Sequence, residues 1–393
     1  MTGASEGSAR PLKVPVTLPW GRIRGRPELF TSYEHEMAVL NTRAKRVWVA
    51  VLVIAAVVWA PFQLRDDLVF QLATVFIVAI GAIGLNLVTG YAGQVSLGHA
   101  FFIGLGAYTA AIVNGEPGTD VVGLGLGMHV WLPAAGIVAA LAGLLVSPIA
   151  FRLKGLYLAV VTLGLVFIGE HLFREAEFLT GGLGVGRPAA LPELFGFAFD
   201  RPSTIVGVSI NRSQGLYLMG FVALAVMALL ARNLARSAVG RAFAAVRDRD
   251  IAAEVMGVSL RRYKALAFTI SSFYAGIAGA LLYTLTGFIE PGSFNILLSV
   301  QFIAMVLIGG VATISGSIAG AAFVILLPRF VQELPRFLPF VTGAQEGGFL
   351  TTQQLEQVLY GLLIIAFLIF EPRGLYGIWV RARNYWRAWP FSY

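Results

Sequence analysis

The chain has 393 residues, of which 57% are hydrophobic and only 13% are charged. That charged fraction is about half the ~25% typical of soluble domains, and the mean hydropathy is +0.77, so the composition indicates a membrane protein. The net charge of +8 is spread among apolar segments and does not indicate nucleic-acid binding, while zero cysteines and four histidines exclude a disulfide framework and disfavour a metal centre.

The membrane domain is predicted over residues 47–371, after a polar N-terminal arm at 1–46. Apolar runs of roughly 20 residues, the length that crosses a bilayer, recur through this region. We expect an all-α polytopic membrane protein with about ten transmembrane helices, and the sequence leaves open whether some of them are broken. The predicted spans are 47–63, 68–89, 94–113, 130–150, 156–172, 215–231, 265–287, 296–312, 314–331 and 355–371.

Loop charges set the expected orientation, because basic residues collect on the cytoplasmic side. They place the arm, a basic loop at 232–264 and the tail at 372–393 in the cytoplasm. The long loop 173–214 is then external and could fold as a small cap. Two uncharged turns, Gly90–Gln94 and Gly310–Ser315, fit either a cytoplasmic turn or a break inside the membrane.

The first of these turns lies in the segment GYAGQVSLGHAFF, which is unusually polar for a lipid environment. Polar groups at membrane depth are costly unless they face protein or water, so they are candidates for a solute pathway. We therefore predict that a pathway is lined or supported by Asn86, Tyr91, Gln94, Ser96 and His99. The alternative is that these side chains only bond between helices while the glycines let helices pack closely.

The basic loop contains a short helix with its own signals for a start and an end. Asp250 suits an N-cap, Ile251–Met256 suits about two helical turns, and Gly257 suits the left-handed position that follows. Because so short a helix is not stable alone and carries apolar side chains, we predict a coupling element that docks on a cytoplasmic ATPase. The alternative is a solvated basic loop. The predicted coupling residues are Phe243, Val246, Asp250, Ile251, Ala253, Glu254, Val255 and Gly257.

Family resemblance appears first in IAAEVMG, which resembles the cytoplasmic EAA…G signature of ABC importer permeases. Ala252, Ala253 and Gly257 match that signature, whereas Ile251 stands in place of its Glu. A more specific resemblance is to the LivM type of permease in branched-chain amino acid ABC importers, and it covers about residues 65–375. The resembling segments, in family order, are GLNLVTGYAGQVSLGHAFFIGLGAYTAA, RLKGLYLAVVTLG, LTGGLGVGRP, AVRDRDIAAEVMGVSLRRYKALAFTISSFYAGIAGALL and VLIGGVATISGSIAGA.

This resemblance implies a bacterial inner-membrane permease, with N- and C-termini cytoplasmic, that imports branched-chain amino acids or related small solutes. It implies a second, LivH-like permease chain, two cytoplasmic ATPase subunits and an extracytoplasmic solute-binding protein as partners. No P-loop motif G-x-x-x-x-G-K-[ST] occurs, so ATP and Mg are expected on the partner subunits and no cofactor is expected in this chain.

Two other functional classes compete with the importer. A stand-alone secondary transporter or channel for a small polar solute usually needs carboxylates at mid-membrane, and here Asp and Glu sit almost wholly in loops or at span ends. An intramembrane serine protease would have to use Ser96 and His99. Both lie on one segment without the G-x-S-x-G elbow, so we expect no enzyme.

Overall fold

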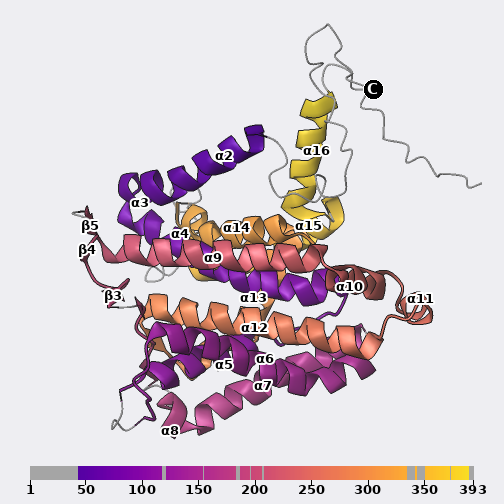
Figure 1. Ribbon diagram of the computed structural model, residues 1–393, viewed down its shortest axis with the longest axis horizontal. Helices are drawn as coiled ribbons and strands as arrows, with labels where there is room; N and C mark the ends of the chain where they lie inside the picture. Colours follow the sequence, from indigo (N-terminus) through magenta and orange to yellow (C-terminus); the bar gives the residue numbers. More distant parts are fainter. Residues whose placement is uncertain are drawn as a thin grey trace, which may run out of the picture.

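The computed structural model describes residues 43–116, 121–153, 155–182, 186–194, 196–205, 208–333, 341–342, 350–371 and 373–388. Most of the predicted N-terminal arm therefore lies outside the described residues. The described chain is mainly helical, and most helices run side by side along the long axis of the molecule (Figure 1).

The helices include two π-helical stretches and one 3₁₀ turn, marked η. In chain order they are α2 (Arg43–Ile54), η1 (Ala55–Trp59), α3 (Ala60–Gln63), α4 (Asp66–Asn86), η2 (Leu87–Tyr91), α5 (His99–Asn114), α6 (Met128–Arg152), α7 (Leu156–Glu175), α8 (Glu177–Thr180), α9 (Arg212–Arg236), α10 (Ala238–Asp248), α11 (Asp250–Val255), α12 (Leu260–Thr286), η3 (Pro291–Ser293), α13 (Ile296–Gly309), α14 (Ile314–Glu333), α15 (Thr352–Phe370) and α16 (Gly374–Ala388).

The predicted membrane architecture is confirmed. Six helices among the described residues are long and apolar enough to span a membrane: Asp66–Tyr91, Met128–Ile149, Leu156–Glu175, Arg212–Arg236, Leu260–Thr286 and Pro291–Gly309. Shorter apolar helices cover Val47–Gln63, His99–Asn114 and Ile314–Arg329. Together with α15, these helices account for each of the predicted apolar runs, so ten is a fair approximate count of the apolar helices rather than of proven spans.

Two long helices, α4 and α12, form the centre of the bundle. α4 packs on α9, α12, α13 and α14, and α12 packs on α5 and α6. Gly276 lets α12 approach α6 closely, because a Cβ atom at this position would lie only 2.5 Å from the Ala135 carbonyl oxygen. Small residues at such crossings bring helix backbones together in membranes, where apolar burial alone gives little drive. The large side chains of the core, such as Phe268 and Phe302, are almost fully buried.

Short strands lie in the segments that connect the helices, and those labelled β3, β4 and β5 in Figure 1 mark one end of the bundle, which we call the hairpin end. The strands are β1 (Arg187–Pro188), β2 (Glu193–Leu194), β3 (Phe197–Ala198), β4 (Ser203–Ile205), β5 (Val208–Ile210), β6 (Phe288–Ile289), β7 (Val341–Thr342) and β8 (Leu350–Thr351). The antiparallel pairs are β1 with β6, β2 with β3 and β4 with β5, and β7 pairs with β8 in parallel.

Arg187 in β1 ties the hairpin end to the helices. Its side chain is buried, and its guanidinium donates hydrogen bonds to the carbonyl oxygens of Leu179 at 2.6 Å, Ala111 at 2.7 Å and Val122 at 3.2 Å. Burial lowers the pKa of Arg187, and the nearby phenol of Tyr108 partly opposes that shift. The carbonyl of Ala111 lies in the last turn of α5, where the helix dipole favours a positive charge.

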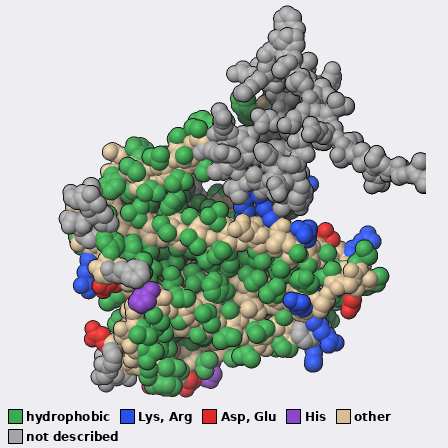
Figure 2. Space-filling model, viewed as in Figure 1, with side chains coloured by type: hydrophobic (Ala, Val, Ile, Leu, Met, Phe, Trp, Pro, Cys, Tyr) green, Lys and Arg blue, Asp and Glu red, His purple; other side chains and the backbone are tan. Residues whose placement is uncertain are grey.

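The opposite end, which we call the basic end, carries α10, α11 and the start of α12. Lys and Arg side chains gather there, while the face between the two ends is mostly hydrophobic (Figure 2). Apolar side chains such as Leu156, Val160 and Ile168 of α7 are 58–79% exposed, which suits contact with lipid rather than water. The apolar middle of the bundle and its charged ends match the apolar core and the polar surfaces of a bilayer.

Candidate functional site

The helix that begins with α4 is interrupted near the basic end. η2 ends at Tyr91, and residues 92–98 are not helical before α5 begins at His99. His99 Nε2 lies 3.0 Å from the carbonyl oxygen of Gly81, ten residues back along the same helix from Tyr91. Ten residues of α-helix rise about 15 Å, so the chain doubles back along α4 and α5 starts inside the bundle. The turn Gly90–Gln94 thus opens into a non-helical return segment, residues 92–98.

Side chains from other helices bond the backbone of this return segment and of the first turn of α5. Leu97 N donates to Thr162 Oγ1 of α7 at 2.9 Å, and Ala100 N donates to Ser299 Oγ of α13 at 3.0 Å. Gln94 N bonds to Val88 O at 2.9 Å. Irregular backbone is tolerated at membrane depth only where it is buried in protein or lines a cavity, and these contacts meet the first condition.

Asn86 holds the second uncharged turn against α4. Its Nδ2 donates to Thr313 O at 2.9 Å and to Ser317 Oγ at 2.7 Å, and it makes a longer contact of 3.4 Å with Gly310 O. Its Oδ1 accepts from Ala312 N at 2.8 Å. Gly310 and Ala312 both have positive φ, 128° and 59°. The chain there makes a tight turn between α13 and α14 rather than a long non-helical segment.

The other predicted pathway residues lie along the return segment, and whether they line a pathway remains a prediction. His99 is 2% exposed and its ring lies 5.1 Å from the ring of Phe302. Ser96 is also buried, and its Oγ lies 3.4 Å from Gly98 N, a long contact. Tyr91 is half-buried at the end of η2 and packs against the hydrophobic core.

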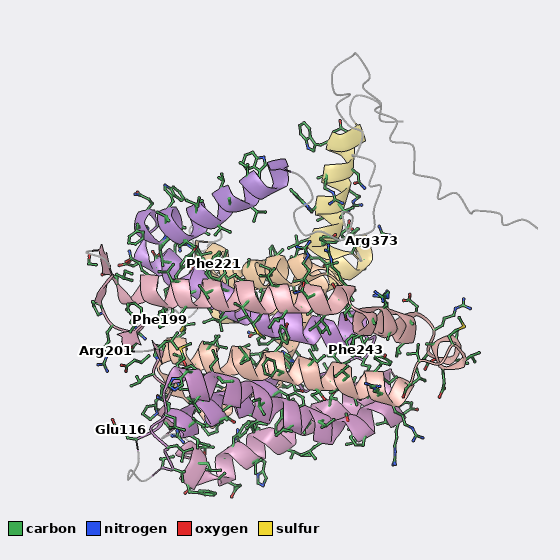
Figure 3. All side chains as sticks on the ribbon, in the orientation of Figure 1. Glu116, Phe199, Arg201, Phe221, Phe243 and Arg373 are labelled. Atoms are coloured by element: carbon green, nitrogen blue, oxygen red, sulfur yellow. The ribbon has the colours of Figure 1, made fainter. Side chains whose placement is uncertain are left out.

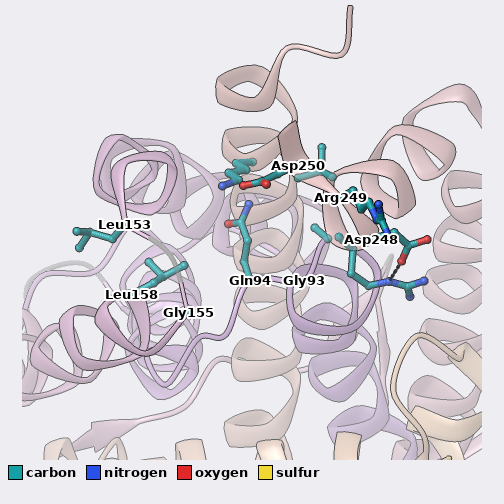
Figure 4. A pocket seen from close by; sticks show the side chains of 12 residues that line it. Gly93, Gln94, Leu153, Gly155, Leu158, Asp248, Arg249 and Asp250 are labelled. Atoms are coloured by element: carbon teal, nitrogen blue, oxygen red, sulfur yellow. Dashed lines mark hydrogen bonds and ion pairs between the residues drawn. The ribbon is translucent and has the colours of Figure 1, made fainter. Parts of the chain in front are cut away.

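Gln94 differs from the other four because its amide has no hydrogen-bond partner among the described residues. Only 4% of the residue is exposed, and both its Nε2 and its Oε1 are buried and unbonded within the described chain. Buried polar atoms without partners cost free energy. The side chain lines a polar cavity of about 240 Å³ and points toward Asp250 (Figure 4). The cavity wall also includes Arg249 and Lys264.

The predicted coupling helix exists at the basic end, one residue earlier than expected. α11 begins at Asp250, and Arg249 is its N-cap. The expectation that Asp250 is the N-cap is therefore wrong, although its carboxylate does accept a hydrogen bond from Ile251 N at 2.9 Å. The signal for the helix end was correct, because Gly257 has a φ of +85°.

The coupling residues divide into an exposed group and a buried group. Ile251 and Val255 on α11 are 73% and 81% exposed. Glu254 is also exposed, whereas Ala253 is buried. Phe243 and Val246 on α10 are buried within the chain, and the Phe243 ring lies 6.4 Å from the ring of Tyr263 on α12. Figure 3 marks Phe243 at the junction of these helices. The two buried residues therefore attach α10 to the bundle, and α11 presents the free apolar side chains.

Arg247 on α10 connects this element to the return segment. Its Nη1 donates to Gly90 O at 3.1 Å, and its Nε bonds to Asp248 at 2.9 Å. Gly93 has a φ of +68°, and a Cβ atom there would lie 2.8 Å from Arg247 Cγ. α10 is thus in direct contact with both glycines that flank the point where the chain turns back. Arg247 lies in the predicted basic loop 232–264, but the sequence did not predict this contact.

Comparison with known proteins identifies the family. The family described as "Branched-chain amino acid transport system / permease component" matches residues 68–368. The chain belongs to this permease family.

Curated members of the permease family resemble the chain over most of its length. LivM of Escherichia coli (strain K12), a high-affinity branched-chain amino acid transport system permease protein, is 32% identical over 347 residues, which cover 85% of this chain and 76% of that protein. LivH of Salmonella typhimurium is 25% identical over 316 residues, which cover 76% of this chain and 91% of that protein. BraD of Pseudomonas aeruginosa is 27% identical over 303 residues, with the same coverage. No solved structure matches the chain significantly.

The permease match contains both turns and the coupling element, whereas α2 and α16 lie outside it. The hydroxyls of Thr162, Ser299 and Ser317, which hold the turns together, were not predicted. They stand singly in apolar helices, and an intramembrane hydroxyl is a recognisable signal. The sequence does not say which backbone group such a hydroxyl bonds.

Proposed function

We propose that this permease forms the membrane path of an ATP-driven importer for branched-chain amino acids or related small solutes. The proposed partners are a second, LivH-like permease chain, two ATPase subunits that bind ATP and Mg, and an extracytoplasmic solute-binding protein. The similarity to LivM and BraD supports the solute class. Similarity to LivH as well supports the pairing of two related chains.

The contact between α10 and the return segment carries the proposal. α11 offers exposed Ile251 and Val255 for an ATPase groove, and each would contribute ~1 kcal/mol or more when desolvated. One residue, Arg249, separates α11 from α10. A displacement of α11 would therefore move Arg247 relative to Gly90 and Gly93, and with them the non-helical segment that leads to His99.

Within that segment we propose that Gln94 contacts the solute and that Asn86 supports the path. The Gln94 amide has unbonded donor and acceptor atoms within the described chain and borders a cavity. It can therefore bond a carboxylate or an ammonium group. The polar atoms of Asn86 are already engaged by the α13–α14 turn. Tyr91, Ser96 and His99 would shape the wall between them.

The proposed orientation places the basic end in the cytoplasm of a bacterial cell, with the permease in the inner membrane. Arg241, Arg247, Arg249, Arg261 and Arg262 lie on α10, at its end or at the start of α12, as the positive-inside rule expects of a cytoplasmic loop. The ATPase subunits would then meet α11 on the side where ATP is available.

The alternative of a stand-alone carrier has weaker support. In the described spans the carboxylates lie toward helix ends: Asp66 and Asp67 open α4, and Glu170 pairs with Arg174 in the last turns of α7. An ion-coupled carrier usually needs a carboxylate nearer to mid-membrane.

Uptake into proteoliposomes separates the two functions. The permease is reconstituted with its candidate partner chain and ATPases, and labelled leucine uptake is measured with the binding protein, with and without ATP. The proposal predicts uptake only when ATP and the ATPases are present, and a several-fold lower rate for Gln94→Ala. Uptake that follows an imposed proton or sodium gradient without ATP would establish the carrier instead.

A further inference from the structure

α16 is an amphipathic helix that the transport function leaves unexplained. Its apolar stripe recurs at helical spacing over Leu375, Ile378, Trp379, Ala382, Tyr385 and Trp386. Trp379, Tyr385 and Trp386 are 64%, 58% and 76% exposed, so the described chain leaves most of this stripe uncovered. Residues 374–388 contain no Asp or Glu.

The position of α16 fits the surface of a membrane. It runs across the direction of the bundle helices (Figure 1), and it packs on α13 and α14. Its start is fixed on the α13–α14 turn, because a Cβ atom at Gly374 would lie 2.5 Å from Ile308 O and 2.7 Å from Gly310 N. An ion pair between Glu371 and Arg381 closes the same junction. α16 therefore leaves the bundle sideways, near the level where the spanning helices end.

A basic crevice lies between α16 and that turn. It has a volume of about 400 Å³, and its wall includes Thr313, Arg373, Tyr376 and Arg383. Figure 3 marks Arg373 at the base of α16. Neither Arg373 nor Arg383 has a carboxylate partner within the described residues, in contrast to Arg381. Guanidinium, hydroxyl and phenol groups are the donors that bind phosphate oxygens well.

We propose that α16 lies in the headgroup layer of the membrane leaflet at the basic end, and that the crevice binds the phosphate of an anionic phospholipid. Trp and Tyr favour this layer, and a basic amphipathic helix without acidic residues binds anionic lipid by burying its apolar face and pairing its charges. A membrane leaflet presents acyl chains beneath its phosphates, so the stripe would meet the acyl chains and the crevice would meet a phosphate. The leaflet is the cytoplasmic one if the proposed orientation holds.

The chain contains no cysteine, so single cysteines can report the surroundings of each face. Trp379→Cys samples the apolar stripe, and Asn384→Cys is the matched position on the other side of the same helix. Each is labelled with a fluorophore in nanodiscs of phosphatidylcholine and phosphatidylglycerol, and quenching by a lipid-borne nitroxide is compared with quenching by a water-soluble one.

The proposal predicts several-fold stronger lipid-borne quenching at 379 than at 384, and the reverse for the water-soluble quencher. Strong water-soluble quenching at 379 would show a free helix. Protection of 379 from both quenchers would show a protein partner on the stripe. Either result overturns the proposal, and neither depends on whether the chain transports amino acids.

The crevice is tested by the lipid that stays bound on purification. Arg373→Gln with Arg383→Gln should retain several-fold less phosphatidylglycerol in native mass spectrometry than the parent chain, and Arg262→Gln, a basic-end control on α12, should retain the parent amount. Equal retention in all three proteins contradicts the headgroup site. Retention of inorganic phosphate in place of lipid would also contradict it.

Discussion

Replacing Asn86 by Ala should destabilise the bundle by about 2–4 kcal/mol, although the change removes only three heavy atoms of one side chain. Asn86 makes three short hydrogen bonds, with Ala312 N, Thr313 O and Ser317 Oγ, at 2.7–2.9 Å. All of them cross from α4 to the turn between α13 and α14 or to the first turn of α14. The loss therefore depends on which of the partner groups keeps another bond.

Only one partner is left without a bond. Ser317 Oγ still donates to Thr313 O at 3.1 Å, so both of those groups remain bonded. Ala312 N loses the acceptor that the described residues give it. An unsatisfied N–H in this half-buried turn costs about 1–3 kcal/mol, and the two donated bonds that are lost add about 0.5 kcal/mol each. The sum gives the stated range.

Denaturant or thermal unfolding of the purified permease, followed by circular dichroism, measures this loss. Asn114→Ala is the matched control, because Asn114 also bonds two backbone groups, Leu126 O and Leu191 N, but at an exposed site. Water can replace those bonds, so the control should lose about 1 kcal/mol or less. Equal losses in the two variants would refute the reasoning that Asn86 holds the turn.

Three further predictions concern the return segment, the coupling helix and the hairpin end. Gly93→Ala should reduce both stability and ATP-driven uptake, because the new Cβ would crowd Arg247 and because a left-handed Ala costs ~1–2 kcal/mol. Gly257→Ala is the control: its new Cβ has no atom within 4 Å, so it should show only the cost of the left-handed backbone. Equal losses of stability in the two variants would show that contact with Arg247 does not matter. Val255→Asp should leave unfolding within ~0.5 kcal/mol of the parent and abolish uptake, with pull-down of the ATPases showing whether docking or signal transfer failed; normal uptake would mean that α11 is only a solvated loop. Arg187→Gln should lower the free energy of unfolding by about 3 kcal/mol, because a buried guanidinium bond is worth ~1.5–3 kcal/mol and three carbonyl oxygens lose their shared donor. An unchanged unfolding midpoint would show that Arg187 does not hold the hairpin end to the helices.

Much of the fold could be predicted from the sequence because membrane spans are set by length and hydropathy. α4, α6, α7, α9 and α12 lie where apolar runs predicted them. The stop of α11 was also predictable, because Gly257 is the residue type that adopts φ > 0 at low cost.

The return segment could not be placed in the same way. The predicted span 94–113 began inside it, because hydropathy averaged over the length of a span is set by the apolar residues of α5, which follow directly. What keeps them out of a helix is tertiary: Thr162 takes the N–H of Leu97, and α10 occupies the space beside Gly93. Hydropathy carries no information about such partners.

The division of the coupling residues into a buried and an exposed group could not be predicted from the sequence, for a related reason. Phe243 and Val255 are both apolar residues on helical stretches of the basic loop, yet Phe243 is 1% exposed and Val255 is 81% exposed. The difference comes from α12, which covers one short helix and leaves the other free. A pattern within a loop does not say which neighbour lies against it.

Arg247→Met shows whether α10 passes movement of the coupling helix to the return segment. The variant removes the bond to Gly90 O but keeps a long side chain. Arg241→Met on the same helix is the control, since the Arg241 guanidinium donates to Arg236 O and no described hydrogen bond joins it to residues 90–98. ATP hydrolysis and leucine uptake are measured together in proteoliposomes. The account predicts that Arg247→Met retains its ATPases and their hydrolysis while uptake falls by about tenfold, equivalent to ~1.4 kcal/mol of lost coupling; uptake equal to that of Arg241→Met would contradict it.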